Sequence, residues 1–170
     1  MVVTIRGERP EGSPAIRRLL AEAFGKEDEA RLVDVLRRRG AITLSLVAVR
    51  SDQVVGHILF SPVTVNSEGS RFNALGLGPM AVAPALQNSG IGSELVKTGL
   101  RKCTDAGYEI AVVLGHPNYY PRFGFKTAKS VGIRCEFDVP DEAFMVMELR
   151  EGALNGRSGI VRYQPEFNDV

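Results

Sequence analysis

Apolar residues recur with helical spacing in the first quarter of the chain. The first predicted helix begins at Ser13, a candidate N-cap that is followed by Pro14, and ends at Gly25. One face of this helix carries apolar residues at positions i, i+3, i+4, i+7 and i+8: Ile16, Leu19, Leu20, Ala23 and Phe24. A second helix is predicted to begin near Glu27 and to end at Gly40.

The middle of the chain changes to a strand-like pattern. Three segments rich in apolar and β-branched residues predict an antiparallel meander: residues 43–50, 54–65 and 74–82. The third segment contains Gly76, Gly78 and Pro79, which predict a bulge or a place where another backbone or a ligand comes close. A third helix should follow Gly92 and carry glycines on its apolar face, so that it can lie close to a sheet.

In the rest of the chain, apolar runs predict strands at residues 110–114, 131–137 and 144–149. Residues 151–170 are expected to form an irregular closing segment. The order of elements indicates an α+β fold. We expect a mixed, mostly antiparallel central sheet flanked by helices, with one crossover helix between Val82 and Ile110. We expect one domain over residues 1–150, with the closing segment packed on it.

Composition excludes several classes of protein. The chain has 170 residues, of which 44% are hydrophobic and 24% charged, with a formal net charge of +1. This balance is typical of one globular domain and lacks the positive charge of a nucleic-acid binder. The N-terminus carries Arg6, Glu8 and Arg9 where a signal peptide needs an apolar core, and glycine and proline interrupt the uncharged stretch 72–93. We therefore expect a cytoplasmic protein without a membrane segment.

The segment Gln87-Asn-Ser-Gly-Ile-Gly92 lies between a predicted strand and a predicted helix. The first N–H groups of a helix have no partner inside the helix, so a glycine-opened helix start can cradle a phosphate. Ser93-Glu94 stands where a P-loop has its lysine, and the third glycine of a dinucleotide fingerprint is missing. The spacing alone is equally compatible with a tight strand-to-helix turn.

Three segments together resemble the GCN5-related N-acetyltransferase (GNAT) family. The segment Gln87–Gly92 matches the family's central motif, which is Arg or Gln, two residues of any kind, Gly, one further residue, and then Gly or Ala. Met80-Ala81-Val82 matches its strand end, and Tyr120 stands four residues before the pair Gly124-Phe125. The segment 115–125 and the tail from Ala153 to Tyr163 resemble the YhbS-like subgroup of predicted acetyltransferases.

The resemblance implies acetyl-CoA as cosubstrate and an amine as acceptor. Two sets of residues would bind the cofactor. The backbone that would hold the pyrophosphate belongs to Gln87, Asn88, Ser89, Gly90, Ile91, Gly92 and Ser93. The backbone that would pair with the pantetheine arm belongs to Met80, Ala81 and Val82, where an N–H would also polarise the thioester carbonyl. From the charge and composition we expect no nucleic-acid or membrane partner, and dimers are common in families of this kind.

The resemblance also implies a direct attack of the amine on the thioester, with Tyr120 as the general acid that protonates the leaving thiolate. A phenol has an ordinary pKa near 10, so it is protonated at neutral pH. The alternative is a packed aromatic ring whose hydroxyl bonds a backbone carbonyl. Neighbouring Tyr119 is expected to pack or to line the acceptor site.

The general base is not evident, because the predicted strand 74–82 contains no acidic residue. His116 follows the buried strand 110–114 and can accept a proton near neutral pH. Its imidazole could instead fix the Gly-His-Pro turn, and a water relay or no dedicated base are further alternatives. His57 is expected to be a strand histidine. Because strand 74–82 has no acidic residue, the protein could also be a non-catalytic acyl-CoA sensor. The absence of a lysine after Gly92 argues against another class of nucleotide-binding protein.

Overall fold

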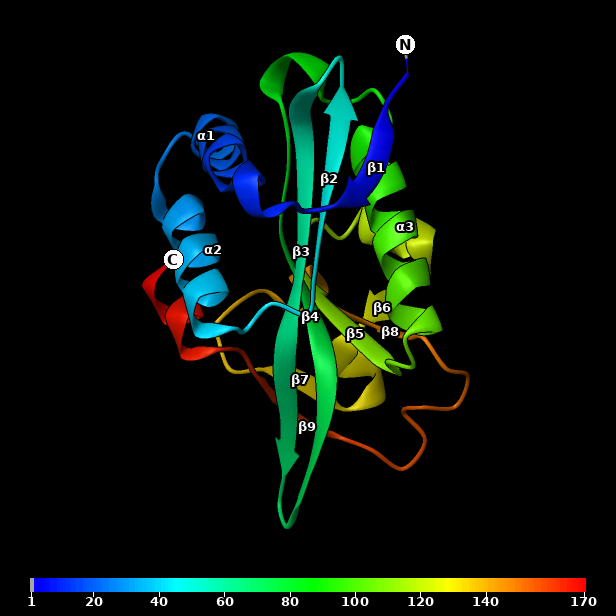
Figure 1. Ribbon diagram of the computed structural model, residues 1–170. Helices are drawn as coiled ribbons and strands as arrows, with labels where there is room; N and C mark the ends of the chain where they lie inside the picture. The colour runs from blue at the N-terminus through cyan, green and yellow to red at the C-terminus, as the bar shows by residue number, and fades with distance from the viewer. Residues whose placement is uncertain (1) are drawn as a thin grey trace. The chain divides into compact units, whose positions relative to one another are not determined.

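The computed structural model describes Val2–Val170. Within these residues the helices are α1 Ser13–Phe24, α2 Asp28–Arg39 and α3 Ile91–Asp105 (Figure 1). The strands are β1 Thr4–Gly7, β2 Leu44–Arg50, β3 Gln53–Ser67, β4 Ser70–Val82, β5 Ile110–Leu114, β6 Lys126–Thr127, β7 Ile133–Cys135, β8 Phe144–Glu148 and β9 Gly159–Arg162. The short 3₁₀ helices are η1 Pro10–Gly12, η2 Pro84–Leu86, η3 Tyr120–Phe123, η4 Ala128–Val131, η5 Asp141–Ala143 and η6 Pro165–Asp169.

The described chain forms two compact units. The first comprises the residues up to Phe60 together with Pro79–Gly99 and Pro165–Val170. The second comprises Ser61–Gly78 and Leu100–Gln164. Strands β3 and β4 therefore each run from one unit into the other. No helix within Val2–Val170 combines the length and the apolar character that crossing a membrane requires.

The predicted mixed, mostly antiparallel sheet is confirmed. Its strand order is β1-β2-β3-β4-β5-β8-β6, and β9 pairs with both β3 and β7. In the first unit, β2 pairs antiparallel with β1 and β3. In the second unit, β4 and β5 pair in parallel from Leu75↔Ala111 to Leu77↔Val113, as the predicted crossover helix requires. A second parallel pair, β7 with β9, was not expected.

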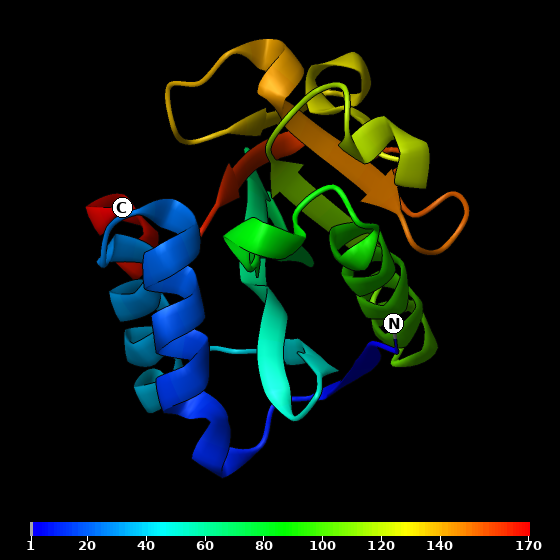
Figure 2. The ribbon, with the colours of Figure 1, turned by 90° about the horizontal axis from the view of Figure 1, so that it is seen from above.

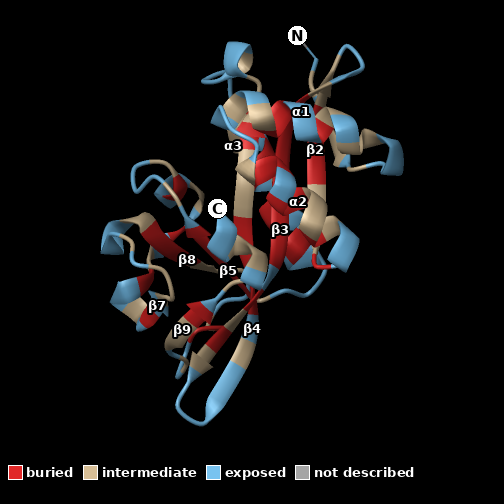
Figure 3. Cartoon of the chain, turned by 90° about the vertical axis from the view of Figure 1, so that its left-hand side faces the viewer, coloured by how far each residue is buried: buried red, intermediate tan, exposed pale blue. Residues whose placement is uncertain are grey.

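In the first unit, α1 and α2 lie side by side (Figures 1 and 2). Their apolar faces form one core cluster with side chains of β2, β3 and β4. The members of the cluster are Ile16, Leu19, Leu20, Ala30, Leu32, Val33, Leu36, Ala41, Val47, Leu59 and Ala81. Figure 3 shows the resulting pattern, with buried residues on the inner faces of these elements and exposed residues on the outer faces of the helices. Both helices end at the predicted glycines, Gly25 and Gly40.

Glycines allow α3 to lie close to β3, as expected. A Cβ on Gly99 would meet the ring of Phe60, with Cζ at 2.9 Å. A Cβ on Gly56 would lie 2.9 Å from Cδ1 of Leu95 and 3.1 Å from Cγ2 of Ile91. Side chains at either glycine would push the helix and the strand apart, because real Cβ contacts are longer than this.

Two expectations about local structure were wrong or incomplete, and two strands were not expected. Ser13 does not cap α1: Gly12 already has helical backbone angles after η1, so the helix begins at Ser13 and no side chain caps it. The expected strand 131–137 is shortened to β7, because η4 and the left-handed Gly132 occupy its start. Strands β1 and β6 were not predicted at all, since each is short and depends on a neighbouring strand.

The closing segment is more regular than expected. The sequence predicted an irregular stretch over residues 151–170, but β9 pairs antiparallel with Thr64–Asn66 of β3 and parallel with β7. Val161 of β9 is fully buried. A four-residue strand between glycine-rich turns has little local signal, and it forms here because two distant strands offer free edges.

Candidate functional site

The loop between β4 and α3 lies at the surface of the first unit. It begins after η2 and leads into α3, and residues Gln87–Gly90 are exposed. Asn88 and Gly90 both have left-handed backbone angles, with φ of +63° and +90°. The carbonyl of Gly90 accepts the first helical bond from Glu94 N at 3.1 Å, so Gly90 is the N-cap residue directly before α3. The predicted cradle is therefore an exposed helix start.

Two side-chain bonds hold this loop in place. Gln87 Nε2 donates to the carbonyl oxygen of Val82 at 3.2 Å, which ties the loop to the end of β4. Ser89 Oγ donates to the carbonyl oxygen of Leu86 in η2. In both bonds a backbone carbonyl is the acceptor, so neither bond uses a backbone N–H group of the loop. Neither bond was anticipated from the sequence, although glutamine and serine are common in turns.

The end of β4 has one backbone edge that does not face β3. Ala83 N donates to the carbonyl oxygen of Val55 on β3 at 2.8 Å. Backbone groups alternate between the two edges of a strand, so Ala81 shares the edge of Ala83, while Met80 and Val82 direct N–H and C=O to the opposite edge. Within the described residues β4 pairs with β5 from Leu75 to Leu77, and β4 continues to Val82. Met80–Val82 and Gln87–Gly92 thus lie together in the first unit.

Tyr120 lies in the second unit, at the start of η3, and is 8% exposed. Its ring makes edge-on contacts with Tyr119 at 5.1 Å and Phe125 at 5.8 Å between centroids. Burial raises the pKa of Tyr120 to about 12, and Tyr119 adds to this increase. The phenol is therefore protonated throughout the physiological range, as a general acid must be.

His116 lies on the exposed turn between β5 and η3. Its backbone carbonyl accepts hydrogen bonds from Tyr119 N at 3.1 Å and Tyr120 N at 3.5 Å. These bonds close the turn through the main chain, so the turn does not depend on the imidazole. The histidine and Tyr120 thus share one short segment of the second unit.

A partly buried polar network was missed by the sequence analysis. His57 on β3 is fully buried, and its Nε2 lies 2.9 Å from Oγ of Ser45 on β2. Ser45 Oγ also bonds Oε1 of Glu8 at 2.6 Å, and Arg37 of α2 donates to both carboxylate oxygens of Glu8 at 2.8 and 2.9 Å. The network links the strands to α2 within the first unit. His57 is the strand histidine that was expected, but its partners are far apart in sequence.

The two cysteines do not form a reactive site. Cys103 is buried in α3, and burial raises the pKa of its thiol to about 11. Burial also raises the pKa of Cys135, which accepts a weak bond from Phe137 N at 3.4 Å. A nucleophilic cysteine needs a lowered pKa, so a covalent cysteine intermediate is disfavoured.

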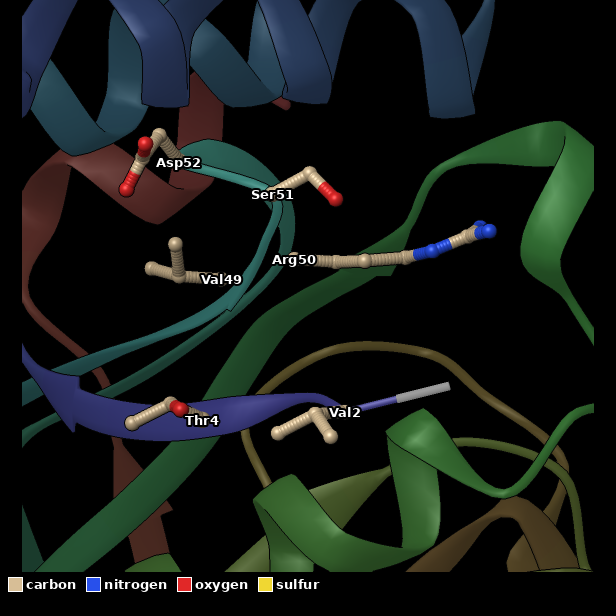
Figure 4. A pocket seen from close by; sticks show the side chains of 6 residues that line it. All are labelled: Val2, Thr4, Val49, Arg50, Ser51 and Asp52. Atoms are coloured by element: carbon tan, nitrogen blue, oxygen red, sulfur yellow. The ribbon is translucent and has the colours of Figure 1, made fainter.

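An open hollow lies at the turn between β2 and β3, beside β1. Its lining side chains belong to Val2, Thr4, Val49, Arg50, Ser51 and Asp52. Figure 4 shows that Arg50 and Asp52 extend in different directions from the turn. None of the residues predicted for acyl transfer lines this hollow, and no role in the reaction is assigned to it.

The mixed sheet, the end of β4 and the exposed helix start together form a known architecture. The chain belongs to the GNAT family of N-acetyltransferases: the model of an acetyltransferase (GNAT) domain matches residues 4–128.

Among its relatives, the Escherichia coli (strain K12) protein YhbS, described as an uncharacterized N-acetyltransferase, is 40% identical over 165 residues, which cover 96% of this chain and 98% of YhbS. YjhQ of the same strain is 37% identical over 130 residues, covering 75% of this chain and 72% of YjhQ.

Two solved structures extend this likeness. The crystal structure of Escherichia coli YhbS in complex with CoA has a TM-score of 0.92 and 40% identity, covering 98% of this chain and 92% of that one. A GNAT family acetyltransferase from Brucella melitensis in complex with acetyl-CoA has a TM-score of 0.81 and 36% identity, covering 98% of both chains. The resemblance to the YhbS subgroup is thereby confirmed.

Proposed function

We propose that this protein is an N-acetyltransferase that moves the acetyl group of acetyl-CoA to a primary amine of a small molecule or a protein by direct attack. The observation that carries the proposal is the exposed start of α3, where Asn88 and Gly90 take left-handed conformations. Left-handed residues at a helix start turn successive N–H groups toward one side, which suits the oxygens of a pyrophosphate. The likeness to two relatives solved with CoA and acetyl-CoA supports it.

In this proposal the backbone of Gln87–Gly92, with Ser93 closing the turn, holds the pyrophosphate. Met80, Ala81 and Val82 pair with the pantetheine arm. The edge of β4 that faces away from β3 offers the N–H and C=O groups of Met80 and Val82 for such pairing. An N–H on this edge would also donate to the thioester oxygen as negative charge develops on it.

The reaction then needs two proton transfers. The amine nitrogen forms a bond to the thioester carbon, the C–S bond breaks, and the thiolate takes the proton of the Tyr120 hydroxyl. The surplus proton of the amine must go to a base, for which His116 is our candidate, directly or through one water. His116 is exposed and its turn is held by main-chain bonds, so its imidazole is available for this role.

The experiment is the release of free thiol from acetyl-CoA across a panel of primary amines, with mass spectrometry of the acetylated product. Amine-dependent thiol release supports the proposal. The same assay with His116→Ala beside the wild type tests the base: the variant should lose rate while its Kd for CoA stays unchanged.

A second candidate function is a non-catalytic acyl-CoA sensor, which the absence of an acidic residue on residues 74–82 favours. Tight CoA binding without thiol release from any amine would favour the sensor over the enzyme.

A further inference from the structure

We propose that Gly115 is a positioning residue for Tyr120: its missing side chain provides the space in which the phenol ring is held. This inference rests on the proposed function, because it concerns the placement of the proposed general acid. It assigns a role to a residue outside the cofactor loop and outside the pair of residues proposed to transfer protons.

The space is defined by short distances. A Cβ built on Gly115 would lie 3.0 Å from Cδ2 and 3.4 Å from Cζ of Tyr120, and nearer still to Cε2. Real Cβ atoms do not approach ring carbons this closely, so either the backbone or the ring would have to move.

The backbone at Gly115 has little freedom to move. Gly115 follows β5 directly, and its N–H donates to the carbonyl oxygen of Ala143 at 2.9 Å. The residue before it, Leu114, pairs with Phe144 of β8. Shifting Gly115 away from the ring would break the end of the β5–β8 ladder, so the ring is expected to yield instead.

The ring of Tyr120 is held on its other sides by aromatic neighbours. Tyr119 and Phe125 contact it edge-on, and Phe123 lies 6.3 Å away between centroids. A ring pushed by a methyl group at position 115 must therefore turn or slide toward solvent, and its hydroxyl moves with it. A displacement of about 1 Å at a reacting group can cost roughly 10²-fold in rate.

The test uses Gly115→Ala with a matched control, Gly99→Ala. A Cβ on Gly99 would press on the ring of Phe60 at similar distances, but Phe60 is a core residue without a role in the reaction. We expect Gly115→Ala to lower kcat roughly 10- to 100-fold while the Kd for CoA stays unchanged. We expect Gly99→Ala to lower thermal stability and, because it moves α3, to change kcat only together with the Kd for CoA.

A double-mutant cycle with Tyr120→Phe separates positioning from a general loss of structure. Once the hydroxyl is gone, its position no longer matters, so adding Gly115→Ala to Tyr120→Phe should lower kcat by no more than about twofold. A further 10- to 100-fold loss of kcat in the double variant would overturn the proposal.

A spectroscopic titration of tyrosinate gives a second readout that needs no turnover. The difference between the wild type and Tyr120→Phe isolates the Tyr120 phenol. In Gly115→Ala this titration should move down from about 12 toward the ordinary value, because the displaced ring gains solvent. An equal pKa of Tyr120 in Gly115→Ala and in the wild type would overturn the proposal. A wild type that is inactive on every amine while the titration moves overturns the proposed function and leaves the placement by Gly115 supported.

Discussion

Tyr120 combines burial with a protonated hydroxyl. Its pKa is raised to about 12, well above the ordinary value of about 8.5 for a thiol, so proton transfer from this phenol to a free thiolate is uphill and must accompany the breaking of the C–S bond. The raised pKa makes the tyrosine a weaker acid in the ground state, yet keeps it fully protonated and ready before each turnover.

Replacing Tyr120 with Phe should slow acetyl transfer by roughly 10²–10⁴-fold, the usual range for the loss of a general acid. The ring stays, so the packing against Tyr119 and Phe125 and the Kd for CoA should barely change. Steady-state kinetics and calorimetric binding check this, with Tyr119→Phe as the neighbouring control. Turnover near that of the wild type would remove Tyr120 from the mechanism.

His57 shows how a hydrogen-bond network fixes a tautomer. Hydrogen bonds from Arg37 and Ser45 outweigh the opposing effect of burial and lower the pKa of Glu8, so its carboxylate is ionised and only accepts hydrogen bonds. The hydroxyl hydrogen of Ser45 therefore goes to Glu8. Ser45 Oγ in turn must accept from His57, which places the proton of the neutral imidazole on Nε2.

Burial lowers the pKa of His57 from 6.5 to about 4, and this predicts a pH-dependent stability. Below pH 6.5 the unfolded chain binds a proton that the folded chain does not take up until near pH 4, so stability falls as the pH drops through this window. The contribution of His57 to the free energy of unfolding changes by up to about 1.4 kcal/mol per pH unit in this window. Protonation of Glu8 lowers the stability further only below pH 4.5, the ordinary pKa of a glutamate.

His57→Gln keeps an amide N–H that can donate to Ser45 but carries no titrating group. The free energy of unfolding, measured with denaturant at pH 7, 6 and 5, should therefore fall less steeply in this variant than in the wild type. Equal slopes would show that His57 does not titrate with a lowered pKa.

At the scale of the elements, the motif Gln87–Gly92 directly determines the conformation of the loop from η2 to α3. Gly90 has a φ of +90°, and a Cβ there would meet no atom within 4 Å. A side chain at this position strains the backbone and projects into the open space in front of the helix start, without clashing with the protein.

Gly90→Val should therefore leave the fold intact and abolish CoA binding. Gly69→Val is the matched control, because Gly69 has a φ of +76° and is equally open, but it lies in the turn between β3 and β4. Both variants should lose similar stability in thermal melts, and only Gly90→Val should lose affinity in calorimetry. Unchanged affinity in a folded Gly90→Val variant would contradict the cradle.

At the scale of the whole molecule, the closing segment belongs to both units. Pro165–Val170 joins the first unit, where Arg39 and Glu166 form an exposed ion pair. Gly159–Arg162 joins the second, where β9 pairs with β3 and β7 and buries Val161. The matched family model ends at residue 128, so this contribution lies beyond it.

Two truncations test how much the closing segment contributes. Ending the chain after Gln164 removes the Arg39–Glu166 ion pair and the half-buried Phe167, which packs against the core of the first unit, so the melting temperature should fall by several degrees. Ending it after Ser158 also removes β9 and leaves two strand edges unpaired, so the protein should unfold at a much lower temperature or fail to fold. Equal melting temperatures for the two truncations would contradict a structural role for β9.

The sequence by itself determined the elements whose signals are local. Helical spacing located α1, α2 and α3, apolar runs located β5 and β8, and the glycine spacing at Gln87–Gly92 located the helix start. These signals work because a helix face or a buried strand imposes its period on nearby residues, and because a left-handed backbone favours glycine.

Tertiary structure alone decided the rest. Strands β1, β6 and β9 form because a distant strand offers its edge, and the network of Glu8, Ser45 and His57 joins residues that no local pattern connects. The space that Gly115 leaves for the Tyr120 ring is likewise a contact between side chain and backbone across a folded turn. Pairing, burial and close packing depend on which segments meet in space, and the order of residues along one segment does not contain that information.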